Sequence, residues 1–128
     1  MEYVASQVAE KIQVSDSGKA KWFRSKPLAI RNHGDLVAML RLSDPTALFP
    51  LEEATISPVV GPDGTAWSSD PSAEILLLGD SFTNIYSLHD LGWGTGAGLA
   101  EHLSLALQKP LDRIAVNAGG ATTTRQTL

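Results

Sequence analysis

An apolar run that ends in a polar triplet most constrains the fold of this 128-residue chain. Ile75 to Leu78 contains no polar residue and leads directly into Gly79-Asp80-Ser81. Short apolar runs of this kind are typical of parallel strands that are covered on both faces. Gly79 and Asp80 favour turns and end the strand. Ser81 is therefore expected at the carboxyl end of a strand, where ligands collect in open α/β sheets.

The second half of the chain predicts a strand, a helix and a second strand. We expect them over Glu74–Leu78, Leu99–Gln108 and Arg113–Asn117. A helical crossover between neighbouring strands makes them parallel. After Asn117 the chain runs through glycines and threonines to Arg125, which predicts another strand-to-helix turn. Two carboxyl-end loops are then expected to face one crevice.

The first half is less regular. A helix over Glu2–Ile12 is expected from its helical apolar spacing, and a second over Asp35–Leu42 with Asp35 as its cap. Residues 43–70 contain four prolines and predict an irregular connection with extended segments such as Ile56–Val60. The whole chain, 1–128, is expected to form one domain. The residues of the second helix expected to point inward are Leu36, Met39 and Leu40.

Charge and composition exclude several classes of function. The net charge of -4, without a cluster of Lys or Arg, argues against a nucleic-acid partner. The chain has no cysteine, which excludes thiolate chemistry, disulfides and cysteine zinc sites. No apolar run approaches the ~20 residues that span a bilayer. We expect no metal and no cofactor.

Ser81 is the candidate nucleophile, and such a serine needs a base and donors for the oxyanion. The N–H groups of Ser81 and Gly119 are the candidate donors. His89 follows Ser81 by eight residues, about 12 Å along a continuous helix, so it is out of reach. His102 is expected as a partly buried surface residue, and His33 is no better placed. The competing interpretation is structural, because Gly-Asp commonly ends strands and Ser commonly caps helices.

These motifs carry a family resemblance. Gly79-Asp80-Ser81-Phe82 after one strand and Asn117-Ala118-Gly119 after the next resemble the first two blocks of the SGNH, or GDSL-type, hydrolase superfamily. The α/β-hydrolase elbow Gly-x-Ser-x-Gly is disfavoured, because position 83 is Thr. The wider pattern is similar to the alginate O-acetyltransferase-like branch. It rests on Gly34-Asp35-Leu36, Met39-Leu40, Leu78 to Ser87, Gly92-Trp93-Gly94, Gly98 to Glu101 and Pro110 to Ile114.

The resemblance implies a fold and a chemistry. The fold is a three-layer α/β/α sandwich with a parallel sheet, incomplete in this chain. Ser81 would be the acyl-accepting nucleophile, and Gly119 would contribute to the oxyanion hole. In this branch the base and its carboxylate come from an Asp-x-His-Trp motif before a helix like Glu2–Ile12. That motif is absent here, so we expect the chain to begin just after it and to be inactive by itself.

Two further residues are candidates for substrate binding. Trp93, among Gly92, Gly94, Gly96 and Gly98, is either a packing anchor or a platform on which a sugar stacks. Arg125 either holds a sugar carboxylate or pairs with Asp80. The glycines also suggest a phosphate loop, but no strand directly precedes them, which disfavours a nucleotide site.

Three functions follow from these patterns. The favoured one is the nucleophile-bearing part of an O-acetyltransferase or esterase that acts on an extracytoplasmic polysaccharide through an acyl-serine. Its partners would be the polysaccharide and an acyl donor. The second is a non-catalytic carbohydrate-binding or assembly module of the same fold. A nucleotide-binding domain is third. Self-association through open sheet edges is also expected.

Overall fold

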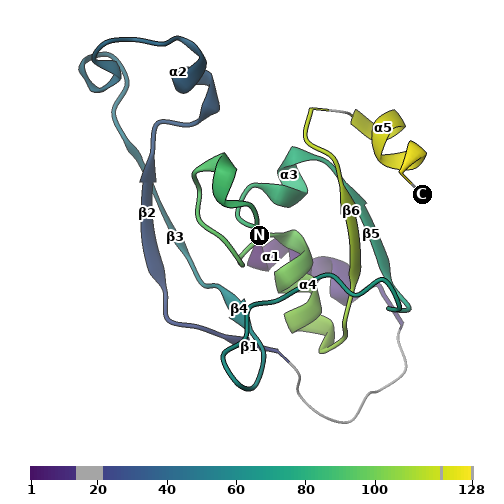
Figure 1. The fold of residues 1–128 in the computed structure, drawn as a ribbon. Helices are drawn as coiled ribbons and strands as arrows, with labels where there is room; N and C mark the ends of the chain where they lie inside the picture. The colour runs from purple at the N-terminus through teal and green to yellow at the C-terminus, as the bar shows by residue number, and fades with distance from the viewer. Residues whose placement is uncertain (14–21, 119, 128) are drawn as a thin grey trace.

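The computed structural model describes residues 1–13, 22–118 and 120–127, and it is a mixed α/β fold (Figure 1). The strands of the described residues form two-stranded sheets. The antiparallel pairs are β1 (Phe23–Arg24) with β4 (Val59–Val60) and β2 (Leu28–Asn32) with β3 (Glu52–Ile56); the parallel pair is β5 (Leu76–Gly79) with β6 (Asp112–Ala115).

The parallel pair confirms the predicted strand, helix and strand. The connecting helix is α4 (Leu99–Leu107), and Leu76 lies opposite Asp112 while Gly79 lies opposite Ala115. The short helix α3 (Ser81–Asn84) follows β5, and α5 (Gly120–Gln126) follows β6. Figure 1 shows α3 and α5 at the same end of the two strands. The two carboxyl-end loops therefore lie at one edge, as predicted.

The core lies between α4, the amino-terminal helix and the segment before β5. Helix α1 (Glu2–Ala9) confirms the predicted first helix, although it ends three residues before Ile12. It packs against α4. The Trp67 indole donates to the Ser104 hydroxyl at 2.8 Å, so the polar atom of this buried ring is satisfied. The buried core consists of Ala5, Trp67, Ala100, Leu103 and Leu111.

One face of β5 is open, which corrects the expectation that the strand is covered on both faces. Leu77 packs against the core, but Leu76 and Leu78 are 42% and 41% exposed. Alternate residues of a strand point to opposite faces, and α1 and α4 supply cover for only one of them. Part of the apolar run of β5 is therefore left in solvent.

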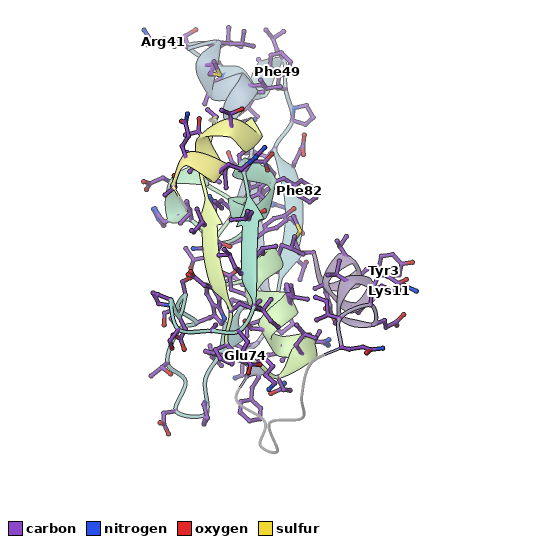
Figure 2. All side chains as sticks on the ribbon, turned by 90° about the vertical axis from the view of Figure 1, so that its right-hand side faces the viewer. Tyr3, Lys11, Arg41, Phe49, Glu74 and Phe82 are labelled. Atoms are coloured by element: carbon purple, nitrogen blue, oxygen red, sulfur yellow. The ribbon has the colours of Figure 1, made fainter. Side chains whose placement is uncertain are left out.

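A long hairpin extends away from this core. Strands β2 and β3 pair from Leu28 opposite Ile56 to Asn32 opposite Glu52. Their connection carries α2 (Asp35–Met39) and η1 (Pro45–Ala47), which form a lobe at the far end of the hairpin (Figure 1). The segment 43–70 thus includes η1, β3 and β4 rather than only irregular chain. In Figure 2, Arg41 and Phe49 mark this lobe, far from Glu74.

Two expectations about α2 are wrong. Gly34, with a φ of 81°, is the residue before the helix, so Asp35 does not cap it. Leu36 and Met39 are each 74% exposed, and Leu40 is also exposed. The amphipathic pattern predicts a buried face only where a core lies beside it, and the lobe is remote from the core. Among the described residues, no helix combines the length and the apolar character needed to cross a membrane.

Candidate functional site

Ser81 lies where the sequence places it, directly after β5. It begins α3, and the Asp80 carboxylate accepts the N–H of Phe82 at 2.9 Å. Asp80 therefore caps the helix, which is its structural role. Ser81 is exposed, and in the described part of the chain its hydroxyl and its N–H make no hydrogen bond. Both groups are free to meet a ligand.

Asn84 holds α3 against the end of β6. Its side-chain amide donates to the carbonyl of Ala115 at 3.1 Å and to Oδ1 of Asn117 at 2.9 Å. Asn84 is 2% exposed, so its side-chain amide depends on these two bonds for hydrogen-bond partners. Asn84 is not among the site residues predicted from the sequence. Its place three residues after Ser81, one helical turn along α3, was the available signal.

Two threonines fix Gly79, the last residue of β5. The Thr124 hydroxyl on α5 donates to the Gly79 carbonyl at 2.8 Å, and the Val116 N–H donates to the same oxygen at 3.3 Å. The Thr83 side chain lies so close to the Gly79 Cα that a Cβ there would collide with it. The strand end that positions Ser81 is therefore tied to both α3 and α5.

Ser81 and Trp93 line one pocket. Its volume is about 210 Å³, and we call it the apolar pocket. Trp93 is half-buried and forms part of the wall, which brings together two residues that the sequence analysis selected separately. Figure 2 shows Phe82, which belongs to this wall, above Glu74 and below the lobe. The lining residues are Ser81, Phe82, Ile85, Leu91 and Trp93.

Arg125 lines a second pocket beside the first. Its volume is about 420 Å³, and we call it the polar pocket. Arg125 and Asp80 both line it, but no ion pair forms between them. The expected alternative of an Asp80–Arg125 pair is therefore not realised, and the guanidinium is available to a ligand. The lining residues are Leu78, Gly79, Asp80, Thr83, Thr124 and Arg125.

Gly119, the second expected oxyanion donor, lies outside the described residues. In the described structure the three histidines make no hydrogen bond to Ser81 and do not line the pockets that contain Ser81 and Arg125. His33 faces the Thr46 hydroxyl at 3.3 Å, and His89 is exposed beside Asp90 at 3.8 Å. His102 is 5% exposed and lines a different pocket, with Glu2, Tyr3 and Arg24. It is more deeply buried than the sequence analysis expected.

The glycine run does not form an open phosphate loop. Gly92, Gly94 and Gly96 have φ between 73° and 83°, which lets the chain turn back along the hairpin. Ala97 and Gly98, before the first turn of α4, are buried. Glu101 occupies that turn and accepts the Ser87 hydroxyl at 2.8 Å. A buried carboxyl at this position opposes phosphate binding.

Two buried groups of α4 have altered proton affinities. Burial raises the pKa of the Glu101 carboxyl above its ordinary value, although hydrogen bonds and Arg113, at 3.4 Å, act in the opposite direction. Arg113 also lies 5.3 Å from the centre of the Trp67 ring. Burial lowers the pKa of His102, and its Nδ1 has no hydrogen-bond partner in the described structure. These groups lie outside both pockets at Ser81.

Residues able to hold a metal ion do not cluster in the part of the chain that the structure describes. Comparisons of the chain with family models, with curated proteins and with solved structures find no match. Ser81 presents a free hydroxyl at the carboxyl end of a parallel strand; it lines the apolar pocket, and Asp80 before it lines the polar pocket.

Proposed function

We propose that this chain is the nucleophile-bearing part of an SGNH-like O-acetyltransferase or esterase that acts on an extracytoplasmic polysaccharide. The observation that carries the proposal is the free Ser81 hydroxyl, which lines a pocket where β5 ends. Asn84 ties this position to the end of β6, so the serine is held by packed elements rather than by a loose loop. The complete fold is proposed to be the three-layer sandwich of that superfamily.

The proposed reaction is acyl transfer in two steps. The Ser81 oxygen attacks the carbonyl carbon of an acyl ester, and an imidazole takes the hydroxyl proton and passes it to the departing alcohol. A sugar hydroxyl or water then attacks the acyl-serine, and the same imidazole returns a proton to Ser81. The imidazole is that of the Asp-x-His-Trp motif, which this chain does not contain.

The polar pocket suits the sugar that accepts the acyl group. The polar pocket offers the exposed Arg125 guanidinium to a polar acceptor. A guanidinium binds carboxylates in a two-pronged manner, so an acidic sugar is the preferred acceptor. The Ser81 N–H is one donor for the oxyanion, and Gly119 is proposed as the second.

The test compares the chain with a form that carries an Asp-x-His-Trp segment ahead of α1. Hydrolysis of p-nitrophenyl acetate and acetylation of Ser81, located by peptide mass mapping, are the two readouts. Ser81→Ala should reduce the rate of the extended form by about 10³-fold or more. Ser68→Ala, a change at an exposed serine remote from the site, should have no effect. An unchanged rate after Ser81→Ala refutes the proposal.

A carbohydrate-binding module of the same fold is the second candidate. The observation that favours it is the absence of a histidine beside Ser81 in the described residues. Binding of an acidic glycan that survives Ser81→Ala, in an extended form without esterase activity, would establish this function instead. Arg125→Gln should weaken binding of the acidic glycan whether the protein is an enzyme or a binding module.

A further inference from the structure

The apolar pocket is lined by fewer polar side chains than the polar pocket. Ser81 supplies a hydroxyl and Trp93 an indole N–H, and the other lining residues are Phe82, Ile85 and Leu91. A sugar ring placed against the walls formed by Phe82, Ile85 and Leu91 would find no hydrogen-bond partners in those side chains. An alkyl chain needs no such partners and would gain from contact with these walls.

The apolar pocket is also larger than an acetyl group requires. In a bound acyl ester the carbonyl carbon must lie at the Ser81 oxygen, and the carbonyl oxygen must face the N–H donors. Only the methyl group of acetate would then enter the pocket. The volume of about 210 Å³ compares with ~30 Å³ for one water molecule, which has about the bulk of one methyl group. An acetyl group would leave most of the pocket unfilled.

The polar pocket is a poor alternative for the acyl chain. Asp80 and Arg125 line it, and an alkyl chain between them would displace water from both charges without offering hydrogen bonds. Asp80 lines the polar pocket, and Ser81, the next residue, lines the apolar pocket. The polar acceptor and the apolar acyl chain can therefore occupy separate pockets during one reaction.

We propose that the apolar pocket binds the alkyl chain of the acyl group carried by Ser81 and selects acyl groups of about four to six carbons. This inference rests on the proposed function, because it takes Ser81 as the nucleophile. Acetyl is then the smallest acyl group that the site accepts. Ile85, Leu91 and Trp93 determine the chain length, and Ser81 forms the ester bond with the acyl carbon as the alcohol leaves.

A binding experiment tests the pocket without requiring catalysis. Acetamide, butanamide and hexanamide are neutral, stable mimics of the acyl group, and each is titrated into the chain and into Ser81→Ala. The Trp93 indole N–H resonance is followed by NMR and is assigned with Trp93→Phe. Hexanamide should bind at least tenfold more tightly than acetamide, because each methylene that enters an apolar site contributes about 0.8 kcal/mol when fully buried.

Matched variants locate the effect. Leu91→Trp fills the apolar pocket and should abolish the advantage of hexanamide. Leu105→Trp makes the same change at a half-buried leucine that lines the separate pocket of His102, and it should leave the advantage intact. Equal binding of the three amides, or a preference that Leu91→Trp does not alter, overturns the inference.

Rates of ester hydrolysis distinguish a failure of the chain-length assignment from a failure of the proposed function. In the form that carries the Asp-x-His-Trp segment, p-nitrophenyl butyrate and hexanoate should react faster than the acetate, and Leu91→Trp should reverse that order. A Ser81-dependent rate that is equal for all chain lengths overturns the inference and leaves the proposed function intact. Hexanamide binding without any Ser81-dependent turnover overturns the proposed function, and with it the assignment of the pocket to an acyl chain.

Discussion

Asn84 donates through its side-chain amide to Oδ1 of Asn117 at 2.9 Å, joining the helix that begins at Ser81 to the loop after β6. The two residues are 33 positions apart and come from the two strand ends that the sequence places at one edge. The bond couples the geometry of the nucleophile to the loop that contains Gly119. Disturbing Asn84 should therefore affect both stability and Ser81.

Asn84→Ala should lower the free energy of unfolding by about 1–3 kcal/mol, because it removes two hydrogen bonds and leaves the half-buried Ala115 carbonyl without this donor. Asn117→Ala removes one bond at an exposed residue and should cost less. Urea unfolding of both variants and of the double variant gives the coupling energy of the pair. Additive effects would show that the bond does not contribute to stability.

The sequence predicted the part of the fold in which local pattern and packing agree. In β5, α4 and β6 the apolar residues, the helix end before Pro110 and the glycines all favour the same elements. In the β2–β3 hairpin and its lobe, local pattern and packing do not agree. Strand β2 contains no fully buried residue, and the apolar residues of α2 predicted a core that is not there. Hydrophobic periodicity reports amphipathic pattern, not the presence of a partner surface.

Some residues of the candidate site could also be predicted from local sequence, and others could not. Ser81 and Trp93 could each be predicted from local sequence, because Gly79-Asp80 precedes the first and glycines flank the second. Their common pocket depends on Ile85 and Leu91, whose distance from Trp93 is set by the turn at η2 (His89–Leu91). The roles of Asn84 and Thr124 depend on contacts across 31 to 45 residues. Such contacts cannot be read from local sequence.

His102 should make stability depend on pH below 6.5. Burial lowers its pKa from the ordinary value of 6.5, so the unfolded chain binds the proton more tightly. The contribution of neutral His102 is complete above pH 6.5 and is lost as the pH falls toward the pKa of the folded state. His102→Gln should flatten the pH dependence measured by urea unfolding. His89→Gln, at an exposed histidine, should not; equal slopes for all three proteins would contradict this prediction.

Glu101 should act in the opposite direction. Burial raises its pKa above 4.5, so the folded chain binds the proton more tightly than the unfolded chain. Relative to Glu101→Gln, the natural chain should become more stable as the pH falls through the folded-state pKa toward 4.5, and the difference should then level off. Glu74→Gln, at an exposed residue, is the control. A difference that grows with rising pH would contradict the assignment.

Self-association through the β5–β6 sheet remains a prediction. Two-stranded sheets offer unpaired backbone groups at their edges, and Leu76 adds exposed apolar surface on the open face. Sedimentation velocity should show a concentration-dependent increase in size that Leu76→Lys reduces. A single size at all concentrations would refute it, and Leu48→Lys, an exposed leucine of the lobe, tests whether the lobe is responsible instead.

A comparison of the buried Leu111 with the exposed Leu36 tests where the core lies. Leu111 is 0% exposed and belongs to the core, so Leu111→Ala should lower the free energy of unfolding by about 2–5 kcal/mol through lost burial and an unfilled cavity. Leu36→Ala removes the same atoms from the exposed lobe and should change the free energy of unfolding by less than about 0.5 kcal/mol. Urea unfolding followed by tryptophan fluorescence measures both, since Trp67 lies in the core with Leu111. Comparable losses in the two variants would mean that Leu36 is buried, as its helical spacing predicts, and that the lobe folds back onto the rest of the chain in solution.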